Sequence, residues 1–324
     1  MQYTAETPQD IDADTGPVGK FPRVTILLAT HNGARHLEAQ LMSYVAQSYT
    51  AWDLWVSDDR SNDDTLAVIS AFAHQHGAGR TIRVLTGPGR GPAANFMSLL
   101  THPDLPVSGF VALSDQDDVW AHQKLAQAVQ AIKACGPMTL YSAQSTHTDA
   151  NLAPIGVSTP PPRALSFHNA LTQNVVSGHS IVMDAQALEL VRRAGPPKGI
   201  PYHDWWLYQL VTGAGGHVYV DTARLIQYRQ HSQNAMGAHD GWRATLLRLW
   251  QVLDRTYGGW IAANMAALHK AAPLLTPQNQ VMLTQIRATP RGPARALRMW
   301  REGLYRQSKS GSVVFYLAAL LGRI

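Results

Sequence analysis

Apolar and polar stretches alternate along the chain from residue 23 to about residue 230. Apolar runs predict buried strands within 24–30, 53–59, 81–87, 109–118 and 139–144. Between them, apolar residues recur every three or four positions, as in Leu37, Leu41 and Val45, which predicts helices, and a further helix is predicted from about residue 121. Residues 87–96 and the Pro-rich stretch 154–164 are predicted as loops. This alternation indicates an α/β fold with a mainly parallel sheet covered on both faces.

The pattern changes near residue 238. Before that point, the segments 180–184, 202–211, 217–221 and 224–237 complete the sheet region. After it, helical patterns dominate, and within residues 287–309 seven basic residues stand against one acid, Glu302. The sequence therefore predicts a disordered polar leader over 1–21, an α/β domain over 22–238, and a helical, basic and amphipathic region over 239–324.

Composition narrows the classes of protein. Hydrophobic residues make up 45% of 324 residues, enough for a sizeable core. The net charge of +5 and a pI near 9.4 favour anionic partners. A disulfide framework is excluded because Cys135 is the only cysteine, so a cytoplasmic protein is expected. The leader lacks the basic start and apolar run of a signal peptide, and no apolar stretch approaches the length of a membrane span.

Polar clusters follow three of the predicted strands: THNG at 30–33, SDD at 57–59 and SDQDD at 114–118. Ligands of open α/β sheets bind at the carboxyl ends of the strands, so three clusters on one edge predict a site. Asp115 and Asp117 are spaced to hold a hard divalent cation together with substrate phosphates. Taken alone, the D-x-D tripeptide is more typical of a turn or helix cap, and the other two clusters are equally typical of a turn. Asp118 is expected to cap the following helix.

Asp204 lies in the apolar and aromatic stretch IPYHDWWLYQL, at the expected start of a helix. A partly buried carboxylate there suits a general base that removes a proton from an attacking hydroxyl. A simple helix cap is the competing interpretation. Trp205 or Trp206 is a candidate to stack on the face of an acceptor sugar.

Taken together, residues 22–237 resemble the family 2 inverting glycosyltransferases of the GT-A fold. The motifs that carry the resemblance follow one another in order: VTILLATHNG, WVSDDRSNDDT, GPAANF, SDQDDVW, SGHSIVMD, HDWW and YRQHSQNAMG. The forms SDQDDVW, HDWW and YRxHxxN are most similar to the bacterial rhamnosyltransferase-like branch, which builds surface polysaccharides from nucleotide-activated sugars. The resemblance implies a nucleoside-diphosphate sugar donor, a glycan or lipid-linked saccharide acceptor, and a Mg²⁺ or Mn²⁺ cofactor.

The resemblance also assigns roles to individual residues. Asp204 would be the catalytic base. The donor nucleotide would contact Ala29, Thr30, His31, Asn32, Asp59, Asn95, Asp115 and Gln116. The metal would be held by Asp117, with Asp115 and His231 assisting. The diphosphate would lie near Arg229, His231 and Asn234, and the acceptor near Gly178, His179, His203 and Trp205. His203 departs from the family pattern, in which many members have Glu before the catalytic Asp.

Other classes fit less well. A sugar-nucleotide pyrophosphorylase would need a Gly-rich loop with Arg and Lys after the first strand, and a dinucleotide dehydrogenase would need G-x-G-x-x-G there. Nucleic acid is disfavoured as a partner because the carboxylates would repel phosphate. A non-catalytic nucleotide or anionic-polymer binder stays an alternative.

The basic stretch RALRMWREGLYRQ admits two interpretations. It either lies on an anionic membrane surface, which would place the protein at the inner face of the cytoplasmic membrane, or packs on the core as an ordinary amphipathic helix.

Overall fold

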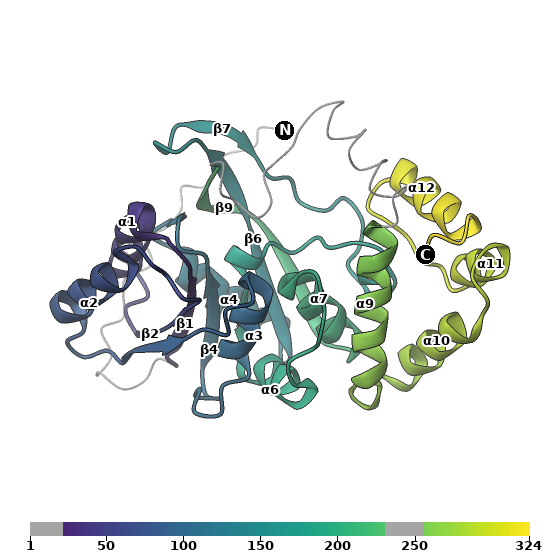
Figure 1. The fold of residues 1–324 in the computed structure, drawn as a ribbon, viewed down its shortest axis with the longest axis horizontal. Helices are drawn as coiled ribbons and strands as arrows, with labels where there is room; N and C mark the ends of the chain where they lie inside the picture. The colour runs from purple at the N-terminus through teal and green to yellow at the C-terminus, as the bar shows by residue number, and fades with distance from the viewer. Residues whose placement is uncertain (1–21, 231–255) are drawn as a thin grey trace, which may run out of the picture.

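The computed structural model describes residues 22–230 and 256–324 (Figure 1). The predicted leader over 1–21 and the predicted boundary at residue 238 lie outside the described residues. The strands are β1 (Val24–Thr30), β2 (Trp52–Asp58), β3 (Ile82–Thr86), β4 (Phe110–Ser114), β5 (Val119–Trp120), β6 (Thr139–Thr148), β7 (Pro154–Val157), β8 (Val182–Asp184) and β9 (His217–Arg229).

Helices lie between these strands and after the last of them. The α-helices are α1 (Ala34–Val45), α2 (Thr65–His76), α3 (Pro92–Leu100), α4 (Lys124–Cys135), α5 (Phe167–Ala170), α6 (Ala185–Ala194), α7 (His203–Gly213), α9 (Thr256–Lys270), α10 (Pro277–Ala288), α11 (Pro293–Arg301) and α12 (Lys309–Leu320). Two short 3₁₀ turns, η1 (Gly178–Ser180) and η2 (Ala272–Leu274), complete the described elements. None of the described helices is both long and apolar enough to cross a bilayer.

The strands form one mixed sheet in the order β3-β2-β1-β4-β8-β6-β9-β5, with β7 added to β6. The predicted α/β fold is confirmed. Its first half is parallel as expected, since β1 pairs in parallel with β2 and β4, and β2 with β3. The second half is mixed: β8 runs antiparallel to β4 and β6, and only β9 runs parallel to β6. One reversal has a plain cause, because β7 returns from β6 through a turn too short for a parallel crossover.

Alternate residues of each central strand point to opposite faces and build two cores. Ile26 and Leu28 face the side covered by α1, α2 and α4. Leu27 faces the other side, where α3, α6 and α7 pack. That second core runs on without interruption into α9–α12, for example to Phe315, which is 1% exposed. The four C-terminal helices therefore pack against the core along one side of the molecule (Figure 1).

Three local predictions were wrong. The stretch 87–96, predicted as a loop, contains the start of α3, where Pro92 follows Gly91 and supplies a φ suited to a first helical turn. The helix expected from about residue 121 begins at Lys124, because Val119 and Trp120 pair with β9 as strand β5. The Pro-rich stretch 154–164 begins as strand β7.

Candidate active site

The carboxyl ends of β1, β2 and β4 lie side by side. Thr30 stands opposite Asp58 in the β1–β2 register, and Leu28 stands opposite Ser114 in the β1–β4 register. The clusters THNG, SDD and SDQDD therefore occupy one edge of the sheet, as predicted, and this edge is called the rim below. The sequence brings them together because parallel strands all end on the same side.

Gln116 ties two of these clusters together. Its side-chain oxygen accepts a hydrogen bond from the N–H of His31 at 2.8 Å, and its side-chain nitrogen donates to the carbonyl oxygen of His31 at 3.0 Å. Gly33 makes room for this pair, since a Cβ there would stand 2.2 Å from the Gln116 oxygen. The middle residue of the D-x-D tripeptide is thus a structural link between the β1 and β4 loops.

Asp58 and Asp59 are both buried and both engaged. Asp58 accepts hydrogen bonds from the hydroxyls of Thr30 and Ser61, which closes the turn after β2. Asp59 accepts from the backbone N–H groups of Gly89 and Gly91, at 2.5 and 2.9 Å. The predicted hydrogen bond from the base of the nucleotide to Asp59 would therefore go to carboxylate oxygens that already accept hydrogen bonds from the 87–91 loop.

The other residues predicted to contact the nucleotide differ in their exposure to solvent. His31 and Asn32 are exposed at the rim, and His31 Nδ1 lies 2.9 Å from the Asp59 carbonyl oxygen. Ala29 is half-buried and Thr30 is buried at the end of β1. Asn95 is 2% exposed; its amide nitrogen donates to the Ser57 carbonyl oxygen, so it supports the end of β2 from below.

Asp204 reaches the rim from the first turn of α7. One of its carboxylate oxygens accepts from the N–H of Gly178 at 3.2 Å, and the other from the N–H of Trp205 at 2.7 Å. These bonds fix the carboxylate against η1. Asp204 is not the helix cap, because that position is held by Tyr202. Gly178 is followed by His179, whose ring lies close to Asp115 and Asp118, so the predicted base is near the D-x-D loop.

Three potential metal ligands meet beneath the rim. One ligand atom each from Asp115, Asp118 and His179 lie within 4.8 Å of one another. His179 is held in place by a ring stack on Tyr228, with centroids 4.5 Å apart, and by Ser145 Oγ, 2.9 Å from its Nε2. Two carboxylates and an imidazole are a donor set that suits Mn²⁺ or a similar divalent ion.

The charges of this cluster fit a cation. Burial raises the pKa of Asp115 to about 7, and the charges of Asp117 and Asp204 act in the same direction. Burial, followed by Asp117 and Asp115, also raises the pKa of Asp118. Burial lowers the pKa of His179 to about 3, which keeps the imidazole neutral and able to bind a metal. A divalent ion would neutralise the carboxylates that crowd this site.

The cluster differs from the predicted metal site. Asp118 was expected to cap a helix, but it is fully buried, and its oxygen accepts from the backbone N–H of Arg229 at 3.3 Å. His179, which is predicted near the acceptor, is buried beside Asp115 and Asp118. Asp117 is half-buried and close enough to raise the pKa of both other aspartates, and its role as a direct ligand stays a prediction.

Lys124 is a feature that no sequence signal indicated. Its side chain is fully buried, and its Nζ lies 3.4 Å from the centroid of the Trp120 ring. Among the described residues this ammonium has no hydrogen-bond partner. Burial holds its pKa well below the usual value, and Asp118 acts in the opposite direction. A buried basic group therefore lies close to the two carboxylates and the imidazole of the cluster.

Two predicted acceptor residues are not open to a sugar. Trp205 is 3% exposed; its indole N–H donates to the Ala170 carbonyl oxygen, and its ring stacks on Tyr257. Trp206 is buried as well. The prediction that one of the two stacks on an acceptor was therefore wrong, because α7 is buried nearly all round.

His203 is also buried, and its ring stacks on Phe96 with centroids 4.2 Å apart. Its Nε2 has no partner among the described residues. A Cβ on Gly178 would stand 2.7 Å from that nitrogen, so glycine is needed where η1 meets α7.

Arg229 supports the loop that carries the aspartates. Its Nε donates to the Asp117 carbonyl oxygen at 2.9 Å, and a terminal nitrogen donates to the Ala150 carbonyl oxygen. The side chain is mostly buried, so its predicted contact with a diphosphate would come in addition to these bonds. His231 and Asn234, predicted for the metal and the diphosphate, lie outside the described residues.

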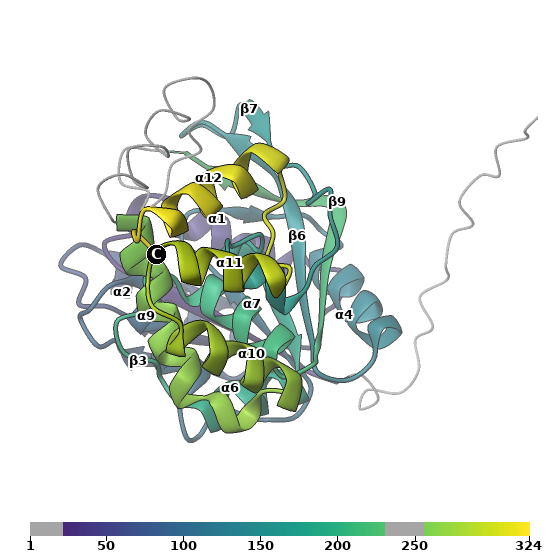
Figure 2. The same cartoon turned by 90° about the vertical axis from the view of Figure 1, so that its right-hand side faces the viewer.

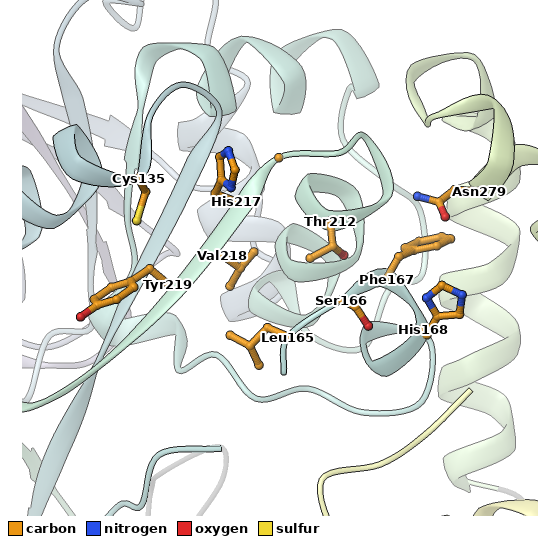
Figure 3. Close-up of a pocket in the computed structure, with 11 residues that line it drawn as sticks. Cys135, Leu165, Ser166, Phe167, His168, Thr212, His217, Val218, Tyr219 and Asn279 are labelled. Atoms are coloured by element: carbon orange, nitrogen blue, oxygen red, sulfur yellow. The ribbon is translucent and has the colours of Figure 1, made fainter. Parts of the chain in front are cut away.

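A separate hollow of about 380 Å³ lies at the opposite end of β9 (Figure 3). It is lined by residues such as Cys135, His168, His217 and Asn279. No predicted site residue lines it, so the rim is where the candidate chemistry gathers.

Comparison with known proteins decides the family. The sequence profile described as Glycosyl transferase family 2 matches residues 25–187, half of the chain. The chain belongs to this family. It is a glycosyltransferase, and the matched region holds all three rim clusters together with η1.

Individual relatives agree with this assignment. The dTDP-rhamnosyl transferase RfbG of Shigella flexneri is 25% identical over 71% of this chain and 80% of its own length. A UDP-Glc:alpha-D-GlcNAc-diphosphoundecaprenol beta-1,3-glucosyltransferase, WfgD of Escherichia coli, is 30% identical over 33% of this chain and 39% of its own length.

Solved structures share the fold. S. aureus TarS, in complex with UDP-GlcNAc, superposes with a TM-score of 0.53 at 15% identity, over 87% of this chain and 93% of that one. The mannosyltransferase PcManGT of Pyrobaculum calidifontis, in complex with GDP-Man and Mn²⁺, has a TM-score of 0.51 at 19% identity, over 94% and 88%.

Proposed function

We propose that this glycosyltransferase moves a sugar from a nucleoside-diphosphate donor to a hydroxyl group of a glycan or lipid-linked saccharide, with inversion at the anomeric carbon and with a divalent cation. The observation that carries the proposal is the bond from the Gly178 N–H to Asp204, because the next residue, His179, belongs to the cluster with Asp115 and Asp118. A general base and a candidate diphosphate site thereby flank one space, as a single displacement requires.

Different residues at the rim would bind the nucleotide and the cation. The nucleotide would lie against the exposed loop of His31 and Asn32, with Asp59 behind it. Asp115, Asp118 and His179 would hold the cation, with Asp117 as a further ligand. When bound, the cation supplies neutralisation of the negative charge that grows on the diphosphate as it leaves.

Asp204 would act on the acceptor. Its carboxylate, fixed by the N–H groups of Gly178 and Trp205, removes the proton of the attacking hydroxyl. The hydroxyl oxygen forms a bond to the anomeric carbon from the face opposite the diphosphate, and the bond to the diphosphate oxygen breaks. The proton stays on Asp204 until solvent removes it, and nucleoside diphosphate leaves.

Rhamnose is the donor sugar we propose to test first. The support is the similarity to a relative named a dTDP-rhamnosyl transferase, over most of both chains. A second relative is named for a diphosphoundecaprenol acceptor, which supports a lipid-linked saccharide as acceptor and a place at the inner face of the cytoplasmic membrane.

A donor screen tests this function. The protein is incubated with dTDP-rhamnose, UDP-glucose, UDP-GlcNAc or GDP-mannose and Mn²⁺, with and without lipid-linked saccharide, and nucleoside diphosphate and glycolipid are measured. We expect acceptor-dependent release of nucleoside diphosphate that a chelator stops. Binding of donors without any turnover would favour the non-catalytic binder, and exchange of pyrophosphate into the donor would favour the pyrophosphorylase.

A further inference from the structure

Helices α11 and α12 carry apolar side chains that point to solvent. They are Leu297 and Trp300 on α11 and Val313, Leu317, Leu320 and Leu321 on and just after α12. We call these six residues the outer ridge. Trp300 is 65% exposed and Leu321 is 67% exposed. The positions on α12 follow one another by four, three and one, so they form a single stripe along the helix.

The outer ridge is not needed to attach the helices to the core. Other residues do that: Ala296 and Met299 on α11, and Phe315, Ala318 and Ala319 on α12, are all buried. Each helix therefore has two apolar faces, of which only the inner one has a partner among the described residues. A second apolar face on a surface helix is typical of a contact with a partner beyond the described residues.

The two helices that carry the outer ridge are neighbours. The start of α11 lies beside the end of α12, since a Cβ on Gly292 would stand 3.7 Å from the Leu320 carbonyl oxygen. The hydroxyl of Tyr316 on α12 donates to the Leu304 carbonyl oxygen just after α11. Both helices lie in the outermost layer on the side that faces the viewer in Figure 2.

The region that carries the outer ridge is strongly basic. Residues 277–324 contain eight Arg or Lys and one acid, which gives a net charge of +7. The acid, Glu302, is paired with Arg298 at 3.4 Å. Four exposed basic side chains take part in none of the hydrogen bonds or ion pairs between described residues: Arg287, Arg291, Arg301 and Lys309.

From these observations we propose that the outer ridge docks on an anionic phospholipid bilayer together with Arg287, Arg291, Arg301 and Lys309, which we call the basic border. Trp, Leu and Val would enter the boundary between headgroups and acyl chains, while arginine and lysine contact anionic headgroups. The evidence for docking comes from this surface and does not depend on the proposed function. If both hold, a lipid-linked acceptor would approach the enzyme from the side of the outer ridge.

Two other occupants explain the surface less well. Nucleic acid would use the basic side chains but would leave Leu317, Leu320 and Leu321 facing phosphate and water. A second copy of the chain would bring two surfaces of net charge +7 together, which like-charge repulsion opposes. A bilayer of anionic lipid satisfies both the apolar ridge and the basic border.

Flotation with vesicles tests the proposal. The full chain is mixed with vesicles of phosphatidylcholine alone or with added phosphatidylglycerol, at low and at high salt. We expect binding to the anionic vesicles only, weakened by salt. The double variant Trp300→Ser/Leu317→Ser should have an affinity for anionic vesicles at least about tenfold lower than that of wild type. The matched control Leu66→Ser/Ile155→Ser removes two other exposed apolar residues and should bind like wild type.

Each other outcome overturns the docking proposal. Equal flotation of wild type and the Trp300/Leu317 variant, or no flotation at low salt, would remove the bilayer as partner. A dimer in light scattering that this variant dissolves would assign the ridge to a second copy, and binding of RNA that it abolishes would assign it to nucleic acid. Donor hydrolysis in detergent-free buffer is measured in parallel and should be unchanged, so loss of docking is distinguished from failure of the proposed function.

Discussion

Gln116 bonds the backbone of His31 with both ends of its amide, at 2.8 Å to the N–H and 3.0 Å to the carbonyl oxygen. The pair fixes the distance between the loop that would face the nucleotide and the loop that carries the aspartates. Gln116, which stands between Asp115 and Asp117 in the sequence, thus acts through the backbone of His31.

Gln116→Glu should weaken donor binding. A carboxylate can accept from the N–H of His31 but faces its carbonyl oxygen with a repulsive lone pair, which costs about 1–2 kcal/mol. We expect the KM for donor to rise roughly tenfold, with a smaller change in kcat. Steady-state kinetics with varied donor measure this. The exposed Gln130→Glu in α4 adds the same charge elsewhere and should leave KM unchanged.

Asp204→Asn should stop turnover while leaving the fold and the donor site in place. The amide keeps the shape of the carboxylate but cannot take a proton, and loss of a positioned base costs about 10²–10⁴-fold in kcat. Donor affinity by calorimetry should stay near wild type. Glu189→Gln, an exposed change on α6, serves as control. Wild-type transfer by Asp204→Asn would show that another group is the base.

Parallel variants distinguish the proposed metal ligands from one another. Because Asp118 and His179 belong to the three-ligand cluster, Asp118→Asn and His179→Gln should each raise the Mn²⁺ concentration for half-maximal activity by about tenfold or more. Asp117→Asn tests the ligand predicted from the sequence. If it alone shifted the Mn²⁺ requirement, the buried cluster would not be the metal site.

The first half of the fold and the position of the site follow from local patterns. Strand ends and polar clusters are readable in sequence, and parallel pairing then brings Thr30, Asp58 and Ser114 to one edge. The sequence likewise predicts Asp204, the proposed base, at the start of a helix, and α7 begins one residue before it.

What sequence could not predict depends on long-range packing. The local sequence predicts Asp118 as a helix cap. The pairing of Val119 and Trp120 with β9, which rules this out, involves residues about a hundred positions away and leaves no local signal. His179 and Trp205 read as acceptor residues because nothing local shows that Tyr228 and Tyr257 cover them. Burial at such positions is a property of the assembled sheet and helices.

The stability of the metal-free protein should depend on pH through Asp115. Its pKa in the folded chain, about 7, lies above the usual value for an unfolded aspartate. Its contribution to stability is therefore full at low pH and is lost as the pH rises through about 7. His179, whose folded pKa is lowered, works in the opposite direction.

Comparison with Asp115→Asn isolates this effect. With chelator present, the Tm of Asp115→Asn minus that of wild type should increase by several degrees from about pH 5 to about pH 8. Mn²⁺ should raise the Tm of wild type, and more so at the higher pH, because the ion competes with the proton. A Tm difference that stays flat across this range would contradict the assigned environment of Asp115.

Lys124→Met should strengthen metal binding. The charge of Lys124 repels a proton on His179, and it would repel a bound cation in the same way. Met keeps the length of the side chain and its contact with the Trp120 ring, and it removes a buried ammonium that has no hydrogen bond among the described residues. Replacing such a charge by an apolar side chain is often neutral or stabilising.

We therefore expect Lys124→Met to bind Mn²⁺ several-fold more tightly and to unfold at a temperature equal to or above that of wild type. Mn²⁺ titration by calorimetry and thermal unfolding measure the two quantities. Lys133→Met, a change of the same type near the exposed end of α4, should alter neither. Weaker Mn²⁺ binding by Lys124→Met would mean that Lys124 holds Asp118 in the geometry for metal binding, and that the attraction between these two residues outweighs the repulsion of the cation.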